Sequence, residues 1–213
     1  SEILMFALNK KVVDAAVVVC DGAGTVVTDK GVIVQGIGAR MNNLLLTSPI
    51  WNTVRRLKES GCQVVFDNAL IQQVIGVRRA IESGYKNIAV TVSGHDAGKL
   101  EELRWLESSR GVQITVLVVC TMGVTDAQID LTRRYADIVW SCSSSEVRQK
   151  IGSAALIQVS KQIPLFVLTP KGVRVLESYS DEEAPLRNLD EKKQYLISKD
   201  PGKRRIRLGN CNN

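Results

Sequence analysis

Residues 15–25 read Ala-Ala-Val-Val-Val-Cys-Asp-Gly-Ala-Gly-Thr, and this stretch decides the fold. Its first six residues form a nearly continuous apolar run, as expected for a strand that helices cover on both faces. The run ends at Asp21, and Gly22 and Gly24 follow, so the chain leaves the strand through a glycine-rich turn. We therefore expect a buried strand over 15–20 whose carboxyl end opens onto this turn.

Short apolar runs alternate with longer amphipathic stretches along the rest of the chain. The expected strands are 63–66, 87–92, 113–120, 137–141 and 163–168. The expected helices are Ser48-Pro49 up to Gly61, 68–83, about 97–108, 125–135, Ser143 or Ser144 to about 154, and 170–176. This alternation predicts an α/β fold with a mostly parallel sheet flanked by helices on both faces, a Rossmann-like three-layer sandwich.

Two parts of the chain fit this pattern poorly. Residues 21–46 read as an excursion of short strands or loop that contains a Gly36-Ile37-Gly38 turn. Residues 181–213 are charged and weakly periodic, so we expect an α/β domain over 1–180 followed by a charged appendage or loose tail.

Composition excludes several classes of protein. The chain is 45% hydrophobic and 23% charged, which is ordinary for a globular domain, and no apolar run approaches the roughly 18 residues of a membrane span. No secretory signal precedes the first strand, and the five cysteines are odd in number and scattered, so we expect a cytoplasmic protein with reduced thiols. The net charge of +6 resides partly in the basic segment 203–207, which argues against nucleic acid as a general partner. That segment is read as a frayed terminus or as a docking device for an acidic protein.

Ligands of open α/β sheets bind outside the carboxyl ends of the strands. In this sequence small, polar and ionisable residues follow the expected strands: Cys20 to Thr25, Asp67-Asn68, Ser93-Gly94-His95-Asp96, Cys120-Thr121-Met122-Gly123, Cys142-Ser143-Ser144-Ser145 and Thr169. Turn chemistry alone accounts for about half of them. The rest indicate a binding site, for which we select Cys20, Asp21, Gly22, Gly24, Thr25, Arg40, Asp67, Asn68, Ser93, Gly94, His95, Thr121 and Ser143.

Cys20, Cys120 and Cys142 fall at the same end of three expected strands. If those strands are neighbours, three thiolates could converge on zinc or an iron-sulfur cluster. No Cys-x-x-Cys spacing supports a metal, and free cysteine is commonly buried as a small hydrophobe, so inert buried thiols are the favoured reading.

Three further residues have individual interpretations. Asp21 after a Val-rich strand resembles the nucleophile of haloacid-dehalogenase-type phosphotransferases, although Ala23 stands where their second acid usually lies and the later acids that hold magnesium are missing. His95, the only histidine, could act as a general acid or base from its loop. Arg40 could clamp a carboxylate or phosphate, or could simply be a surface residue.

Several separated blocks carry a resemblance to a known family. They are residues 15–25, 34–38, 84–92, 136–142, 165–169 and Lys171-Gly172. In this order they resemble the methanogenesis marker protein 8 family, over residues 1 to about 177. The resemblance implies an archaeal cytoplasmic protein tied to methane metabolism, and it implies neither a reaction nor catalytic residues.

Three functional hypotheses follow. The first is a methanogenesis-associated accessory protein that binds a small anionic ligand or cofactor at the carboxyl edge of the sheet. The second is a phosphoryl- or acyl-transfer enzyme that uses Asp21 or Cys20 as nucleophile, which requires the nucleophile to be open to solvent beside a base or a metal. The third is a scaffold that binds a protein partner, and a homo-oligomer is left open.

Overall fold

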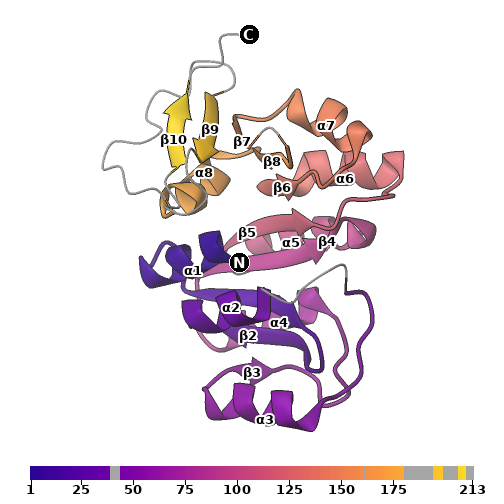
Figure 1. Ribbon diagram of the computed structural model, residues 1–213. Coiled ribbons are helices and arrows are strands. Elements are labelled where there is room, and N and C mark those ends of the chain that lie inside the picture. The colour runs from indigo at the N-terminus through magenta and orange to yellow at the C-terminus, as the bar shows by residue number, and fades with distance from the viewer. Residues whose placement is uncertain (39–43, 161, 180–193, 199–205, 210–213) are drawn as a thin grey trace.

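The computed structural model describes residues 1–38, 44–160, 162–179, 194–198 and 206–209. Its strands form one mixed sheet in the order β10-β9-β7-β8-β6-β5-β4-β1-β2-β3 (Figure 1). The strands are β1 (Ala15–Cys20), β2 (Gly24–Thr28), β3 (Gln63–Val64), β4 (Asn87–Ser93), β5 (Gln113–Val119), β6 (Ile138–Trp140), β7 (Ile157–Val159), β8 (Leu165–Val167), β9 (Gln194–Ser198) and β10 (Ile206–Gly209). The fold is therefore α/β, as the alternating pattern predicted.

The centre of the sheet is parallel and its sides are largely antiparallel. β1, β4, β5 and β6 run in one direction, with Val17 opposite Val90 and Val118 opposite Val139. Antiparallel pairs join β1 to β2, β2 to β3, β6 to β8, β7 to β8 and β9 to β10. The prediction of a mostly parallel sheet holds for the centre and for the pair β7 and β9, and the other pairs are antiparallel. Between β1 and β2 a tight turn leaves no room for a crossover helix and forces a hairpin.

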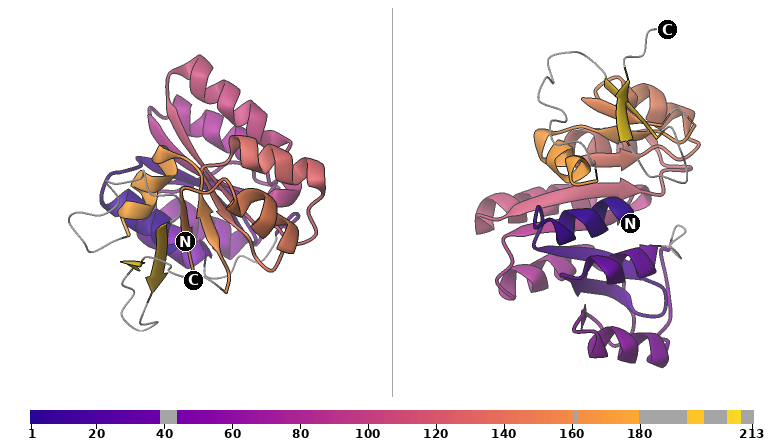
Figure 2. Two further views of the ribbon diagram at one scale, coloured as in Figure 1. Left: turned by 90° about the horizontal axis from the view of Figure 1, so that it is seen from above. Right: turned by 60° about the vertical axis from the view of Figure 1, so that its left-hand side comes forward.

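Helices cover both faces of the sheet. They are α1 (Glu2–Asn9), α2 (Gly31–Gly38), α3 (Trp51–Glu59), α4 (Gln73–Glu82), α5 (Lys99–Arg110), α6 (Asp126–Tyr135), α7 (Ser145–Gly152) and α8 (Pro170–Glu177). In Figure 1, α1 and α2 lie in front of the central strands and α4 and α5 lie behind them, and Figure 2 shows the same layers from two other directions. Alternate residues of β1 serve the two layers: Ala16 and Val18 join the core under α1 and α2, whereas Ala15 and Val17 join the core under α4.

Residues 31–38 form helix α2, not the short strand and turn that the sequence predicted. Gly36 and Gly38 lower the helix propensity of this segment, which is why it was read as a loop. Burial overrides that propensity, because Val34 and Ile37 lie three residues apart on one side of the helix and both are buried in the core. Helix α1, strand β7 and the 3-10 turn at 94–96 are further elements that the sequence did not predict.

Two described segments of the predicted tail belong to the sheet. β9 lies parallel to β7, and β10 pairs with β9, so the sheet extends beyond β7 into the region predicted to be an appendage. In the part of the chain that the structure describes, no helix has the length and apolar character needed to cross a bilayer.

Candidate functional site

Four strand ends share one edge of the sheet. At the centre, Ser93 at the end of β4 pairs with Val119 at the end of β5, and β1 and β6 flank these strands in the same direction. The exits at Cys20, Ser93, Cys120 and Cys142 therefore lie along one rim. This arrangement is the one that the strand pattern predicted, and it is the position at which α/β sheets bind ligands.

Thr169 does not belong to this rim, although the sequence placed it there. Strand β8 runs antiparallel to β6, so the residue that follows β8 emerges at the opposite edge. There the Thr169 hydroxyl donates a hydrogen bond to Asp137 Oδ1 (2.6 Å) and accepts one from the Gly172 amide (3.1 Å). Thr169 is thus the N-cap of α8 and part of the packing at that edge.

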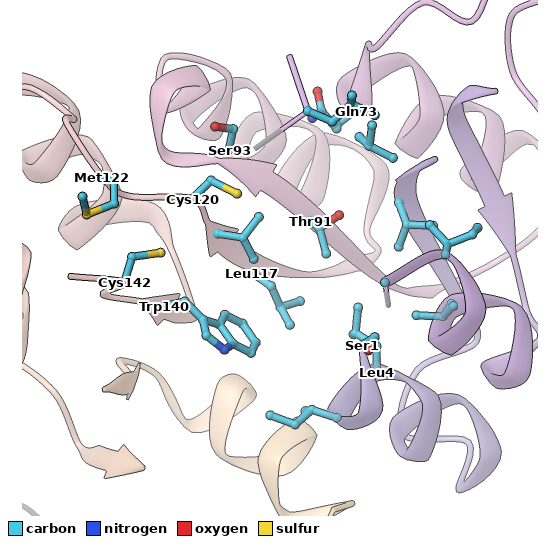
Figure 3. A pocket seen from close by; sticks show the side chains of 18 residues that line it. Ser1, Leu4, Gln73, Thr91, Ser93, Leu117, Cys120, Met122, Trp140 and Cys142 are labelled. Atoms are coloured by element: carbon cyan, nitrogen blue, oxygen red, sulfur yellow. The ribbon is translucent and has the colours of Figure 1, made fainter. Parts of the chain in front are cut away.

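A cavity of about 440 Å³ opens beside the shared rim. Its volume falls in the range of small-molecule sites, about 300–1,000 Å³. It lies between the sheet, the start of α1 and the end of α2 (Figure 3). The lining residues are Ser1, Ile3, Leu4, Val18, Val19, Val34, Ile37, Gly38, Leu44, Gln73, Thr91, Ser93, Leu117, Val119, Cys120, Met122, Trp140 and Cys142.

The floor of this cavity is the sheet face that α1 and α2 cover. Val18, Thr91 and Leu117 come from three neighbouring strands and, by the two-residue repeat of a strand, project toward that face. Trp140 lies beside Leu117 at the end of β6, and Leu4 of α1 lies across from them (Figure 3). Because most of the lining is aliphatic or aromatic, the cavity is suited to a ligand that is mainly apolar.

Few polar groups face this apolar lining. Thr91 is 8% exposed, and in the described structure its hydroxyl has no hydrogen-bond partner. Ser93 and Gln73 already have partners: the Ser93 hydroxyl accepts a hydrogen bond from the His95 amide (3.3 Å), and the Gln73 side-chain carbonyl accepts one from Lys99 Nζ (3.2 Å). Buried hydroxyls are normally paired, so the partnerless Thr91 hydroxyl has unused capacity for a ligand.

Cys120 and Cys142 line the cavity, and Cys20 does not. The Cys20 side chain is buried at 8% exposure, and its thiol donates to the carbonyl oxygen of Asp21 (3.4 Å). The described residues contain no group of three His, Cys, Asp or Glu side chains arranged to hold a metal ion. The predicted meeting of three thiols is therefore not found, because β1 turns into the β2 hairpin at Cys20 and keeps that side chain in the core.

The glycine-rich turn after β1 has packing roles. Asp21 is exposed, and its carboxylate accepts a hydrogen bond from the Thr47 hydroxyl (2.5 Å), whose oxygen accepts one from the Gly22 amide (2.9 Å). The buried Thr25 hydroxyl donates to the carbonyl of Leu70 (3.0 Å). These bonds fasten the turn to the segments before α3 and α4, and none of its residues lines the cavity.

The other predicted site residues are spread along the rim. Asp67 and Asn68 are exposed beyond β3, where Asp67 pairs with Lys58 (3.3 Å). His95 is partly buried, and its carbonyl accepts from the Gln128 amide (2.8 Å). Gly94 and Thr121 are buried, and the Thr121 hydroxyl donates a hydrogen bond to the Trp140 carbonyl (2.7 Å). Ser143 is exposed. Arg40 lies outside the described residues.

Sequence reasoning missed the residues that build most of the cavity. Thr91 and Leu117 lie inside strands and Leu4 lies in an unpredicted helix, so a search confined to strand ends passed over them. One signal was present: Thr91 is the polar residue in the apolar run 88–92, where a hydroxyl facing a covered sheet needs a partner.

The comparisons with known proteins match most of the chain. A family model described as "Uncharacterized protein conserved in archaea (DUF2099)" matches residues 1–179. The chain belongs to this family. "Uncharacterized protein MJ0054" of Methanocaldococcus jannaschii is 37% identical over 180 residues, which are 83% of this chain and 61% of that relative. No solved structure shows significant similarity to the chain. These findings support an archaeal DUF2099 protein, and neither description carries the methanogenesis marker name that the sequence resemblance suggested.

Proposed function

We propose that this DUF2099 chain binds a small, mainly apolar molecule in the cavity between the sheet and helices α1 and α2. The observation that supports the proposal is the unpaired, buried Thr91 hydroxyl in an otherwise apolar cavity beside the carboxyl rim. An unpaired buried hydroxyl costs about 1–3 kcal/mol, and a ligand that hydrogen-bonds to it offsets that cost. The Thr91 oxygen would then orient the ligand while aliphatic contacts supply most of the binding.

The lining favours a neutral ligand over the anionic one that the sequence suggested. No Lys or Arg side chain is among the described residues that line the cavity. The Lys99 ammonium, which donates a hydrogen bond to the Gln73 side chain, also forms an ion pair with Asp96 (3.0 Å), so its charge is already compensated. An anion would therefore meet no Lys or Arg side chain in the lining, and a buried charge without such a partner is unfavourable.

The proposal can be tested with two fluorescent probes of similar size and different charge. Neutral N-phenyl-1-naphthylamine is expected to bind wild-type protein with enhanced fluorescence, and the anionic 1-anilinonaphthalene-8-sulfonate is expected to bind more weakly. Val119→Trp, which places an indole at the end of β5 inside the cavity lining, should abolish the neutral probe's signal. Val32→Trp adds the same ring at a site that is 72% exposed and should leave the signal unchanged. Equal binding by the two tryptophan variants would refute the cavity as the site.

Thr91→Val provides a second test, on stability. Valine keeps the shape of threonine and removes the hydroxyl, so the ligand-free variant is expected to be more stable than wild type by about 1 kcal/mol. Urea unfolding monitored by circular dichroism measures this difference. Thr25→Val is the matched control on β2, because Thr25 is a buried strand threonine whose hydroxyl donates to the Leu70 carbonyl (3.0 Å). A loss of stability at Thr91 as large as at Thr25 would show that the Thr91 hydroxyl already has a partner.

The resemblance to the methanogenesis marker protein 8 family extends the proposal to a cytoplasmic role in methane metabolism. That extension depends on the separated sequence blocks and on no feature of the cavity. The transferase hypothesis receives no support from the geometry, because Cys20 is buried and Asp21 lies outside the cavity lining. The scaffold hypothesis stays a prediction.

A further inference from the structure

Two thiols lie at one end of the cavity, those of Cys120 and Cys142, and the sulfur of nearby Met122, a 55% exposed residue, points away from them (Figure 3). The register of β5 with β6 explains why the two cysteines are neighbours. Val118 pairs with Val139, so the same register continued places Cys120 opposite Ser141, the residue before Cys142. Adjacent strands are about 4.8 Å apart, and the two thiols therefore project from neighbouring positions on the rim.

Both cysteines have an unusual backbone conformation. Cys120 has a φ of 58° and Cys142 a φ of 48°, in the left-handed region that glycine or asparagine adopts at lower cost. This conformation fixes the direction in which each thiol leaves the end of its strand. In Figure 3 the sulfur atoms of Cys120 and Cys142 point to the same side, toward the cavity.

Hydrogen bonds hold the two exits in place. The Cys142 carbonyl accepts bonds from Arg148 (3.2 Å) and from the Ser141 hydroxyl (3.2 Å). Next to Cys120, the Thr121 hydroxyl bonds to the Trp140 carbonyl (2.7 Å) and so ties the end of β5 to the end of β6. The separation of the two thiols is therefore set by main-chain contacts and not by a mobile loop, as a binding site for an ion requires.

The donor set is soft. The described lining contains two thiols and one thioether, and it contains no His, Asp or Glu. Structural zinc and iron-sulfur clusters usually take four ligands, whereas Cu(I) is selected by thiolate and thioether sulfur. We propose that the thiolates of Cys120 and Cys142 bind Cu(I) at the mouth of the cavity. Binding releases the two thiol protons and forms two copper-sulfur bonds with no change of oxidation state.

This site differs from the three-cysteine site predicted from sequence, since it uses two of the three thiols and leaves Cys20 buried in the core. It also goes beyond the proposed ligand site, which depends on Thr91 at the centre of the cavity. The two proposals can therefore fail separately.

The test is a competition for Cu(I) under anaerobic, reducing conditions, with bathocuproine disulfonate as the coloured chelator. Wild-type protein is expected to withhold about one equivalent of copper per chain from the chelator, as one soft-metal site requires. The double variant Cys120→Ser/Cys142→Ser should withhold none, whereas Met122→Leu should withhold copper as wild type does, because the Met122 sulfur points away from the two thiols. The controls are Cys62→Ser, which changes a buried thiol that contacts Thr28 away from the cavity, and Cys20→Ser, which changes a buried thiol outside the cavity lining. Both should behave as wild type.

The proposal would be overturned if the chelator removed all copper from the wild-type protein, or if the double variant still bound copper. A loss of copper in either control would overturn it as well, because the ion would then be bound elsewhere. Circular dichroism of the double variant confirms that it is folded. Its binding of N-phenyl-1-naphthylamine reports on the ligand site independently, so copper loss with retained probe binding assigns the effect to the sulfur atoms.

Discussion

Asp137→Asn is expected to destabilise the protein by about 3 kcal/mol, the lower end of the cost of breaking a buried ion pair. The carboxylate is at the amino edge of the sheet, opposite the cavity, and its side chain is 2% exposed. Asparagine keeps its shape and removes its charge. The measurement is urea unfolding of both proteins at neutral pH.

The expected effect is large because one carboxylate satisfies three donors. Asp137 Oδ2 accepts hydrogen bonds from Arg104 (2.7 Å) and from the Val116 amide (2.7 Å), and Oδ1 accepts from the Thr169 hydroxyl (2.6 Å). Burial by itself would lower the pKa of Arg104, but the carboxylates of Asp137 and Glu107 raise it above its ordinary value. Removing the charge of Asp137 leaves a largely buried guanidinium with less compensation, and these contacts join β5, β6, α5 and α8.

Asp67→Asn is the matched control. Asp67 also pairs with a cation, Lys58 at 3.3 Å, but its side chain is 83% exposed. Exposed pairs contribute about 0–1 kcal/mol, so the control should differ little from wild type. Equal stability losses in the two variants would show that the Asp137 network is no stronger than a surface pair.

The central strands, most of the helices, and the rim at which β1, β4, β5 and β6 end could be predicted from the sequence because they depend on local patterns. The Val-rich run at 15–20 is buried on both faces, and the side chains of Thr125, Ser144 and Thr169 cap helices α6, α7 and α8. Ser144 was one of two predicted caps, and the helix at Pro170 was predicted to begin where it does. In each case the residues that specify the element lie within one turn of each other.

The cavity could not be predicted because its walls combine residues that are distant along the chain. Thr91 and Leu117 become neighbours only through the pairing of β4 with β5, and Leu4 reaches them only because α1 packs on that face. The antiparallel direction of β8 was missed for a similar reason, since β7 had not been recognised and the hairpin that reverses the chain was therefore not seen. Tertiary pairing, and not local propensity, decided both outcomes.

Gly24→Ala is expected to destabilise the protein by about 2–4 kcal/mol, from two additive causes. Gly24 has a φ of +68°, a conformation that alanine adopts at a cost. A Cβ at this position would also lie 2.2 Å from the carbonyl oxygen of Ala69, a main-chain atom that cannot rotate away. The variant would have to separate the β1–β2 hairpin from the segment that leads into α4, and urea unfolding measures the loss.

Gly36→Ala is the control of opposite sign. Gly36 is in helix α2, where an added Cβ meets no atom within 4 Å, so alanine should stabilise the protein by about 0.5–1 kcal/mol.

The Gly24 and Gly36 variants together distinguish two explanations of the glycines after β1. If Gly24 were needed only to bring backbone amides close to an anion, its space would be open in the ligand-free protein and alanine would cost little more than the φ penalty. A large loss at Gly24 beside a gain at Gly36 means that Gly24 is required for close packing.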